Sequence, residues 1–308
     1  MDVATASAAR GTKVHAAPVR SAARAKINLD LLVTGRRADG YHELDTLVTF
    51  ADVGDVVEAR TNASGPPIGI DVQGPFAAAM REACPKAGDN LVVRAAAALH
   101  ALASRNGIAP PPVHLTLHKH LPIASGVGGG SADAAATIGA LSRLWNLPPR
   151  LEGRNDLPAL LGADVAMCLA GRPLRATGAG ERLEPVRLPA LDLVLLNPGV
   201  PVSTADVFAR PEARRSPARE LPDVSSVEAL IAHLRATGND LVEAARAVGA
   251  PIDECLAALE DGLFAGMSGS GATCFAIFSD RAAADASAAR IREAHPGWWV
   301  TPATTVAA

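Results

Sequence analysis

A glycine-rich turn between a strand pattern and a helix pattern constrains this chain more than any other feature. The turn covers residues 125–131 (Ser-Gly-Val-Gly-Gly-Gly-Ser), residues 113–121 alternate polar and apolar, and residues 132–145 place apolar side chains near helical spacing. Glycines allow successive backbone N–H groups to point inward, and the start of a helix adds a positive dipole. This order indicates a cradle for a phosphate group; a flexible strand-to-helix turn is the alternative.

The two commonest nucleotide-binding glycine motifs do not fit this turn. The dinucleotide fingerprint G-x-G-x-x-G matches Gly126 and Gly128, but Ser131 stands where the third glycine belongs. The Walker A motif requires a Gly-Lys dipeptide, which the sequence lacks. The turn therefore predicts a phosphate site of another type.

Composition limits the class of protein to which the chain can belong. It has 308 residues, of which 49% are hydrophobic and 20% charged, with a formal net charge of −3. These values exclude a wholly disordered chain and favour two domains. A near-neutral charge and few aromatic residues (six Phe, three Trp and one Tyr) are not typical of a nucleic-acid binder, so we expect no nucleic-acid partner.

The sequence also bears on the compartment. No apolar run approaches the roughly 20 residues that span a bilayer, so we expect no membrane partner. Residues 1–19 are rich in alanine and lack the apolar core of a secretory signal, which predicts a flexible tail, with a targeting segment as the alternative. The four cysteines form no C-x-x-C pair, which predicts free, mostly buried thiols and a cytoplasmic location.

Strand and helix patterns alternate along the chain, which indicates an α+β or α/β fold. Strands are expected at 23–34, at 46–59 as two short strands broken at Gly54-Asp55, and at 113–121, 191–196 and 273–278. Helices are expected at 90–104, 132–145, 156–169, 226–236, 239–247, 251–262 and 281–294. Residues 61–89 are expected to be mostly connection and residues 209–226 a solvated, mobile loop, with a domain boundary near 175.

Two further segments carry side chains suited to chemistry on a phosphate. Lys26, Asn28 and Asp30 share one face of the first predicted strand, where a lysine and an asparagine together hold a phosphate and a hydroxyl. A solvated strand face is the alternative. Asp164 stands at a predicted helix start, where the helix dipole favours the ionised carboxylate. A plain helix cap is the alternative there.

Tyr41 and His42 follow a turn, and Tyr41 is the one tyrosine of the chain. This pair is typical either of a ring stacked on a ligand base, with the histidine on its edge, or of an amphipathic pair beside the core. Three histidines share one face of the predicted strand at 113–121: His114, His118 and His120. A metal site is one interpretation, but we expect them to lie on the solvated side of the strand.

Three separated segments resemble the motifs of the GHMP kinases, the family of galactokinase, homoserine kinase, mevalonate kinase and phosphomevalonate kinase. Residues 25–29 (Ala-Lys-Ile-Asn-Leu) resemble the first motif, residues 121–135 the second, and residues 268–272 (Ser-Gly-Ser-Gly-Ala) the third. The likeness extends over about residues 20–295. It implies an α+β, two-domain GHMP kinase fold, with a ribosomal protein S5 domain 2-like N-terminal domain (20–175) and a ferredoxin-like C-terminal domain (176–308).

Within that family, residues 35–44, 162–165, 197–200 and 238–241 are similar to members that act on a cytidine diphosphate-linked alcohol. The resemblance implies transfer of the γ-phosphate of ATP to the 2-hydroxyl of a CDP-linked methylerythritol, in the non-mevalonate route to isoprenoid precursors. It also implies Mg²⁺ as cofactor. The partner is then this small-molecule substrate, and the sequence leaves monomer and homodimer open.

The resemblance also assigns residues to roles. Asp164 is expected to be the base and Lys26 its charged partner. The residues expected to contact the cytidine-bearing substrate are Asn28, Tyr41, His42, Thr204 and Phe208. Those expected to bind ATP are Asn90, near adenine, and Pro122, Ile123, Ala124, Ser125, Gly126, Val127, Gly128, Gly129, Gly130, Ser131 and Ala132. The third motif contributes Gly269, Ser270 and Gly271. For Mg²⁺ the choice between Ser131 and Asp133 stays open.

The chain departs from the family pattern in two places. Ala166 stands where proline is common, and Arg172-Pro173 interrupts an expected Gly-Gly-like turn. Three other functions compete with the one implied: a GHMP kinase for mevalonate, homoserine or a sugar, a decarboxylase of the same fold, and a catalytically silent nucleotide-binding regulator.

Overall fold

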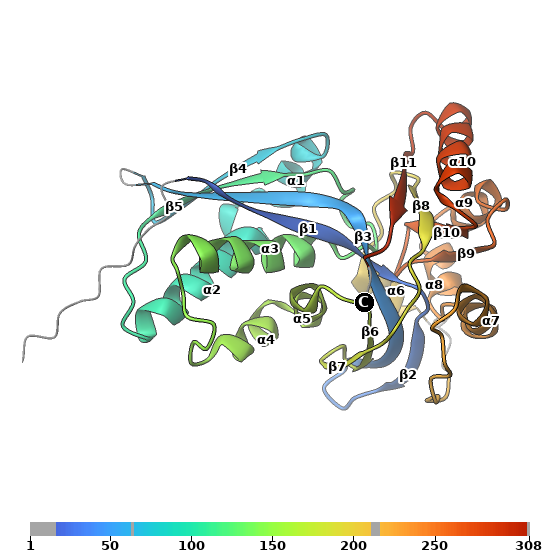
Figure 1. Cartoon of the computed structure of the whole chain (residues 1–308), viewed down its shortest axis with the longest axis horizontal. Helices are drawn as coiled ribbons and strands as arrows, with labels where there is room; N and C mark the ends of the chain where they lie inside the picture. Colours follow the sequence, from blue (N-terminus) through green and yellow to red (C-terminus); the bar gives the residue numbers. More distant parts are fainter. Residues whose placement is uncertain (1–16, 63–64, 211–215, 307–308) are drawn as a thin grey trace, which may run out of the picture.

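The computed structural model describes residues 17–62, 65–210 and 216–306, and two β-sheets organise them (Figure 1). A seven-stranded sheet comes mainly from the N-terminal half, and a four-stranded sheet from the C-terminal half. Residues 1–16 of the predicted tail lie outside the described residues. The first strand begins at Val19, the last residue assigned to that tail.

The larger sheet is built around one long central strand. Its members are β1 (Val19–Asn28), β2 (Leu32–Arg36), β3 (His42–Thr61), β4 (Ile68–Gln73), β5 (Val113–His118), β6 (Leu174–Gly178) and β7 (Arg182–Pro185). The order is β4-β5-β3-β6-β7, and both β1 and β2 pair antiparallel with β3. The pairing between β4 and β5 is parallel.

The prediction of two short strands broken at Gly54-Asp55 is wrong, because β3 runs without interruption through both residues. Gly54 pairs with Arg24 of β1, and a Cβ atom at Gly54 would lie 2.2 Å from the carbonyl oxygen of Ala23. The glycine therefore permits a close approach of two backbones rather than a turn.

The prediction that residues 61–89 are mostly connection is also wrong. This stretch contains β4 and helix α1 (Ala77–Ala83), followed by a short 3₁₀ helix at Ala87–Asp89. Prolines at 66 and 67 stand just before β4, where they mark the start of an edge strand rather than its absence.

Four further helices accompany the larger sheet; α3 packs on β1 and β3, and α2 packs on α3. They are α2 (Leu91–Arg105), α3 (Gly129–Leu144), α4 (Leu157–Leu161) and α5 (Ala163–Ala170), with a 3₁₀ helix at Arg154–Asp156. The helices predicted at 90–104 and 132–145 are confirmed as α2 and α3. The single helix predicted at 156–169 is instead two, because Gly162 has a φ of 121° that an α-helix does not accommodate.

The smaller sheet has the order β11-β8-β10-β9. Its strands are β8 (Asp192–Asn197), β9 (Phe264–Met267), β10 (Cys274–Phe278) and β11 (Trp299–Thr304). The helices of this half are α6 (Thr204–Ala209), α7 (Val227–Thr237), α8 (Val242–Ala247), α9 (Ile252–Ala258) and α10 (Arg281–Ala294). The predicted strand at 273–278 and helix at 281–294 are confirmed.

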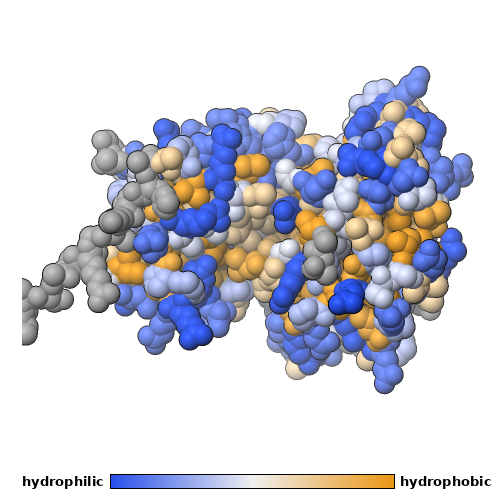
Figure 2. Space-filling model, in the orientation of Figure 1, coloured by the Kyte–Doolittle hydropathy of each residue, from blue (hydrophilic) through white to orange (hydrophobic). Residues whose placement is uncertain are grey.

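One hydrophobic cluster belongs to both halves of the chain. Ile27 and Leu47, from β1 and β3, pack in it with Leu193, Leu195 and Phe275 of the smaller sheet. On the face shown in Figure 2, hydrophilic residues predominate, and hydrophobic patches surface on both halves and between them. The predicted boundary near residue 175 falls inside β6, so the larger sheet continues past it.

The predicted free cysteines are confirmed: Cys255 and Cys274 are buried, and Cys84 and Cys168 are partly buried. No helix in the described part of the chain is long and apolar enough to cross a membrane. Of the predicted solvated loop, residues 211–215 lie outside the described residues. The prediction is wrong for Arg219, whose side chain is only 11% exposed and is paired with buried carboxylates.

Candidate active site

The Lys26 ammonium is the central charge of the site. Lys26 belongs to β1 and follows an irregularity in that strand. The register between β1 and β3 shifts between Arg24 and Lys26. The Lys26 ammonium lies 3.1 Å from Asn28 Oδ1 and 3.0 Å from Asp164 Oδ2. Lys26, Asn28 and Asp30 are all buried. The solvated strand face is therefore ruled out for these three residues.

Asp164 reaches Lys26 from the first turn of α5, at the positive end of the helix dipole. The two partners differ in exposure: the Asp164 side chain is 43% exposed and that of Lys26 only 5%. The carboxylate thus stands at the opening with the ammonium behind it. This arrangement lets a ligand approach the carboxylate.

The glycine turn lies against Lys26 and begins α3. Gly128 caps that helix in the left-handed conformation, with a φ of 63°. A Cβ atom there would lie 2.9 Å from Lys26 Cε, so only glycine fits without displacing the lysine. The Lys26 backbone N–H donates to the Val127 carbonyl at 3.0 Å. The free N–H groups of the first turn of α3 then line the pocket beside Lys26, as a phosphate cradle requires.

The third glycine segment packs directly on this turn. Ser268 Oγ donates to the Gly126 carbonyl at 3.0 Å and accepts from the Asn28 N–H at 3.1 Å. A Cβ atom at Gly126 would lie 2.5 Å from the Ser268 carbonyl oxygen. The three motifs, far apart in the sequence, therefore meet at one point.

These segments line a cavity of about 480 Å³. The lining includes the following predicted site residues: Lys26, Asn28, Pro122, Ile123, Ala124, Ser125, Gly126, Gly128, Gly129, Gly130, Ser131, Asp164, Thr204, Phe208, Gly269 and Ser270. Val127 and Ala132 are instead buried in hydrophobic clusters. Gly271 stands outside the lining as well, in the turn before β10. These three residues belong to the segments that form the cavity without lining it themselves.

Tyr41 and His42 line a neighbouring pocket of about 560 Å³, which shares Leu44, Thr204 and Phe208 with the main cavity. The His42 and Phe208 rings lie 4.9 Å apart at 31°. Tyr41 stands at the tip of the β2–β3 hairpin and is 67% exposed. The structure therefore brings Tyr41, His42 and Phe208 around one hollow, with the aromatic faces that a planar base requires.

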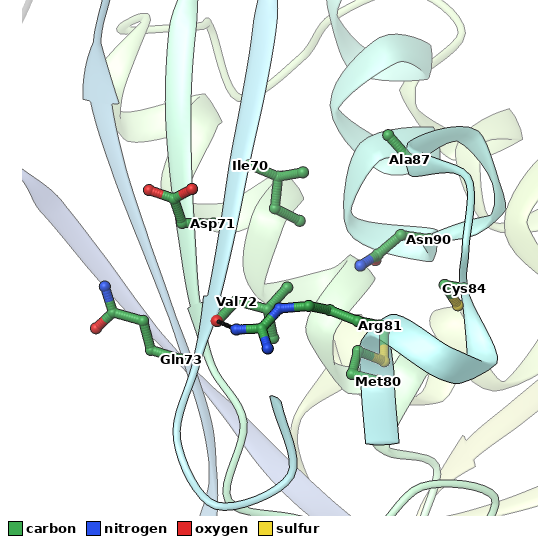
Figure 3. Close-up of a pocket in the computed structure, with 9 residues that line it drawn as sticks. All are labelled: Ile70, Asp71, Val72, Gln73, Met80, Arg81, Cys84, Ala87 and Asn90. Carbon is green, nitrogen blue, oxygen red and sulfur yellow. Dashed lines mark hydrogen bonds between the residues drawn. The ribbon is translucent and has the colours of Figure 1, made fainter. Parts of the chain in front are cut away.

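Asn90 lies at the other end of the site, in a pocket of about 390 Å³ between β4, α1 and α2. Its Oδ1 accepts from the Val92 N–H and caps α2. Figure 3 shows its amide nitrogen pointing from the start of α2 toward β4, while Arg81 reaches the Val72 carbonyl. Met80 and Cys84 line both this pocket and the main cavity.

Ser131 and Asp133 differ in their access to the cavity. Ser131 lines it, whereas Asp133 is buried and pairs with Lys119, which also contacts Asp55. Burial, only partly offset by Lys119, raises the pKa of Asp133 to about 7. The described residues contain no group of three or more His, Cys, Asp or Glu side chains placed to hold a metal. His114 instead pairs with Asp71 at 3.0 Å.

Sequence reasoning missed Thr46 as a site residue. Its hydroxyl accepts from Asn28 Nδ2 at 2.9 Å, and the residue lines the main cavity. A threonine in an alternating strand carries no signal that separates it from its neighbours. Only the pairing of β1 with β3 reveals its position.

Comparison with known proteins agrees with this geometry. Residues 90–172 match the family model of the GHMP kinases N terminal domain, and residues 219–297 that of the GHMP kinases C terminal domain. A protein of Cereibacter sphaeroides named 4-diphosphocytidyl-2-C-methyl-D-erythritol kinase is 48% identical over 91% of this chain and 97% of its own length. One of Brucella melitensis with the same name is 45% identical, over 91% of this chain and 93% of its own.

Solved structures point the same way. A crystal structure of 4-(cytidine 5'-diphospho)-2C-methyl-D-erythritol kinase is 31% identical, with a TM-score of 0.74, over 94% of this chain and all of its own. Homoserine kinase from Cytophaga hutchinsonii, at 19% identity and a TM-score of 0.63 over 94% of this chain and 95% of its own, shares the fold. With both family domains and relatives matched over most of its length, this chain belongs to the GHMP kinase family.

Proposed function

We propose that this enzyme transfers the γ-phosphate of ATP to the 2-hydroxyl of 4-diphosphocytidyl-2-C-methyl-D-erythritol, in the non-mevalonate route to isoprenoid precursors. The observation that carries the proposal is the Lys26–Asp164 pair, 3.0 Å apart, beside the glycine turn. The names of relatives 45–48% identical over nine-tenths of the chain support the choice of substrate.

In this proposal the two ends of the site hold the two substrates. The backbone N–H groups around Gly128 hold the phosphates of ATP, and the pocket of Asn90 takes its adenine. The hollow between Tyr41, His42 and Phe208 takes the cytosine ring, which stacks on aromatic faces. The methylerythritol then spans the main cavity, so that its 2-hydroxyl reaches Asp164.

The proposed reaction is an in-line displacement. The 2-hydroxyl oxygen bonds to the γ-phosphorus, the bond from that phosphorus to the ADP oxygen breaks, and the hydroxyl proton passes to Asp164. Because such transition states are loose, placement and charge matter more than a strong base. The Lys26 ammonium orients the hydroxyl and offsets negative charge on the transferring group.

Mg²⁺ fits the donors that the cavity offers, because the Ser131 hydroxyl and the Asp164 carboxylate are hard oxygen ligands. The Ser131 hydroxyl, together with phosphate oxygens of ATP, would hold the ion, and the buried pairing of Asp133 argues against that residue. Bound there, Mg²⁺ neutralises phosphate charge. We further propose a cytoplasmic enzyme, supported by the four free thiols, that works as a monomer or homodimer.

An ADP-release assay tests the proposal. Purified protein, ATP and Mg²⁺ are incubated in parallel with the CDP-linked methylerythritol, mevalonate, homoserine and galactose. We expect ADP release with the CDP-linked alcohol to be at least about 100-fold faster than with the other alcohols. A site that binds the cytosine ring of its substrate rejects alcohols that lack this ring. Preference for another alcohol, release of carbon dioxide, or ATP binding without turnover would each replace the proposal by one of its rivals.

A further inference from the structure

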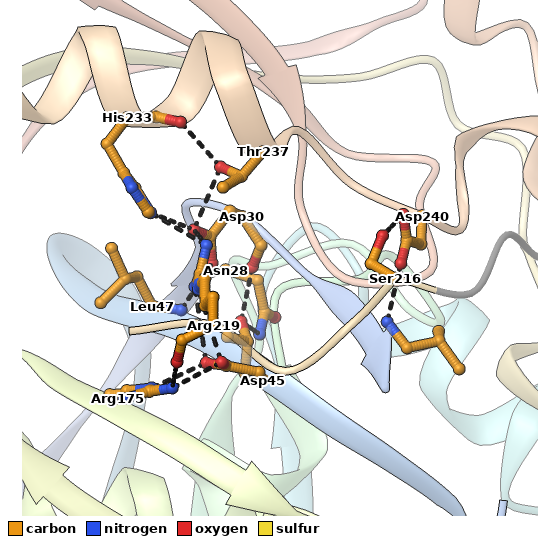
Figure 4. Close-up of polar contacts among 12 residues, drawn as sticks. Asn28, Asp30, Asp45, Leu47, Arg175, Ser216, Arg219, His233, Thr237 and Asp240 are labelled. Atoms are coloured by element: carbon orange, nitrogen blue, oxygen red, sulfur yellow. Dashed lines mark hydrogen bonds and ion pairs between the residues drawn. The ribbon is translucent and has the colours of Figure 1, made fainter. Parts of the chain in front are cut away.

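Asp30 and Arg219 form a buried ion pair behind the candidate active site, outside the cavity lining (Figure 4). Arg219 Nη1 lies 2.7 Å from Asp30 Oδ2 and Nη2 3.0 Å from Oδ1, so the contact is bidentate. Asp30 also accepts from the Leu47 N–H at 2.7 Å and contacts His233 Nε2 at 2.9 Å. The carboxylate is therefore fully enclosed and held from several sides.

A second buried carboxylate extends the cluster. Asp45 accepts from Arg175 Nε at 2.8 Å and Nη2 at 2.6 Å, and Arg219 Nε lies 3.4 Å from it. Arg175 also donates to the backbone carbonyl of Arg219 at 2.8 Å. The two aspartates thus face two arginines. This balance of charge makes it tolerable that both aspartates are buried and both arginines largely so.

The cluster joins the two halves of the chain. Arg219 belongs to the segment 216–219, which runs beside the start of β2. Ser216 anchors the other end of that segment: its N–H donates to the Val33 carbonyl at 2.9 Å, and its Oγ donates to Asp240 at 3.0 Å. Segment 216–219 is therefore held to Val33 of β2 at one end and to Asp30 and Asp45 at the other.

A chain of hydrogen bonds leads from Asp30 to the catalytic pair. The Asp30 carbonyl accepts from Thr46 Oγ1 at 2.5 Å, and Thr46 Oγ1 accepts from Asn28 Nδ2 at 2.9 Å. This bond turns Asn28 Oδ1 toward Lys26, which donates to it at 3.1 Å. Asp30 lies between the end of β1 and the start of β2, and backbone hydrogen bonds join its neighbours Leu29 and Leu31 to Leu47, Gly238 and Asp240. The Asp30 side chain adds contacts with the Leu47 N–H, Arg219 and His233, so it helps to hold the carbonyl to which Thr46 donates.

We infer that Asp30 and Arg219 are positioning residues, which fix the Lys26–Asn28 pair for phosphoryl transfer through the Asp30 carbonyl and Thr46. This inference rests on the proposed function. Arg219 touches neither the glycine turn nor the pocket of Asn90, so its loss alters placement of the acceptor hydroxyl and leaves ATP binding intact. A displacement of catalytic groups by about 1 Å lowers rates by up to about 100-fold.

The first test compares Arg219→Met and Asp30→Asn with the wild type in steady-state kinetics. We expect kcat to fall about 10- to 100-fold in both variants, while the KM for ATP stays within about twofold. Asp30→Asn keeps both arginines on Asp45, so it carries the test if Arg219→Met does not fold. Arg246→Met is the matched control: it breaks a more exposed arginine–aspartate pair that belongs neither to this cluster nor to the cavity lining, and its kcat should equal that of the wild type.

The second test examines the route through Thr46. If Thr46 transmits the effect of Arg219, the double variant Arg219→Met/Thr46→Val is no slower than the slower single variant. Multiplied losses, or unchanged kcat in both Arg219→Met and Asp30→Asn, would overturn the inference. So would a rise in the KM for ATP that parallels the fall in kcat. A wild-type enzyme without turnover would instead defeat the proposed function, and the two failures are therefore distinct.

Discussion

Asp164 is the residue on which the proposed chemistry depends most directly. We predict that Asp164→Asn lowers kcat at least about 100-fold, because it removes a positioned proton acceptor. ATP still binds, since the glycine turn is unchanged. Asp253→Asn, an exposed aspartate in the first turn of α9, is the control and keeps full turnover. Near-normal turnover of Asp164→Asn would remove this residue from the mechanism.

Asp30 makes stability depend on pH in a defined direction. Burial by itself raises the pKa of this carboxyl, but hydrogen bonds from His233 and Arg219 outweigh it, and the pKa is lowered below 3.8. A lowered pKa stabilises the fold above pH 3.8, and the contribution disappears as the pH falls through the folded-state pKa.

We therefore predict that Asp30→Asn costs about 3 kcal/mol at pH 7, the scale of a broken buried ion pair. The difference from the wild type should shrink below about pH 4. Urea unfolding of both proteins at pH 7, 5, 4 and 3 measures this difference in the free energy of unfolding. The contributions of the other carboxyl groups are common to both proteins and cancel in the difference. A difference that does not change with pH would show that the ionised form of Asp30 is not what the fold requires.

At the scale of elements, the contact between the glycine turn and the third motif requires glycine at 126. Its φ is 79°, and an added Cβ atom would lie 2.5 Å from the Ser268 carbonyl oxygen and 2.7 Å from that of Gly271. We predict that Gly126→Ala destabilises the protein by about 1–3 kcal/mol and raises the KM for ATP, because the turn must move away.

Gly297→Ala is the control for this prediction, since an added Cβ atom there meets nothing within 4 Å. Thermal melts and ATP titrations of both variants give the comparison. Equal melting temperatures for the two variants would contradict the close packing of the turn on the third motif.

At the scale of the whole molecule, the shared core makes the two halves depend on each other. Because β1 and β3 contribute Ile27 and Leu47 to the same cluster as Leu193 and Phe275, neither sheet is fully covered without the other. We predict a single unfolding transition.

Tryptophan fluorescence follows each half separately. Trp145 is buried among the helices of the N-terminal half, and Trp298 and Trp299 lie in the C-terminal half. One variant keeps only Trp145, and a second keeps only Trp298 and Trp299. In each variant, we expect the urea midpoint measured by fluorescence to equal the midpoint measured by circular dichroism. Separate midpoints would mean that residues 20–175 form an independent domain.

Several elements were predictable because their signals are local. Helices α2, α3 and α10 follow from unbroken apolar spacing, and β10 from a short apolar run. The same rules failed at Gly54, because a glycine where two strands approach closely has the same local signature as a glycine in a turn. These rules also failed at residues 61–89, because prolines that precede an edge strand have the same local pattern as prolines in a loop.

Local sequence patterns were enough to predict the kinds of groups in the candidate site: a glycine turn, a lysine on a strand and an aspartate at a helix start. Which of them meet depends on tertiary packing, since the contact of Lys26 with Asp164 depends on how α5 packs beside β1. It also decided that Asp30 and Arg219 are buried together. Burial of a polar residue depends on which distant segment covers it, and no local pattern records that.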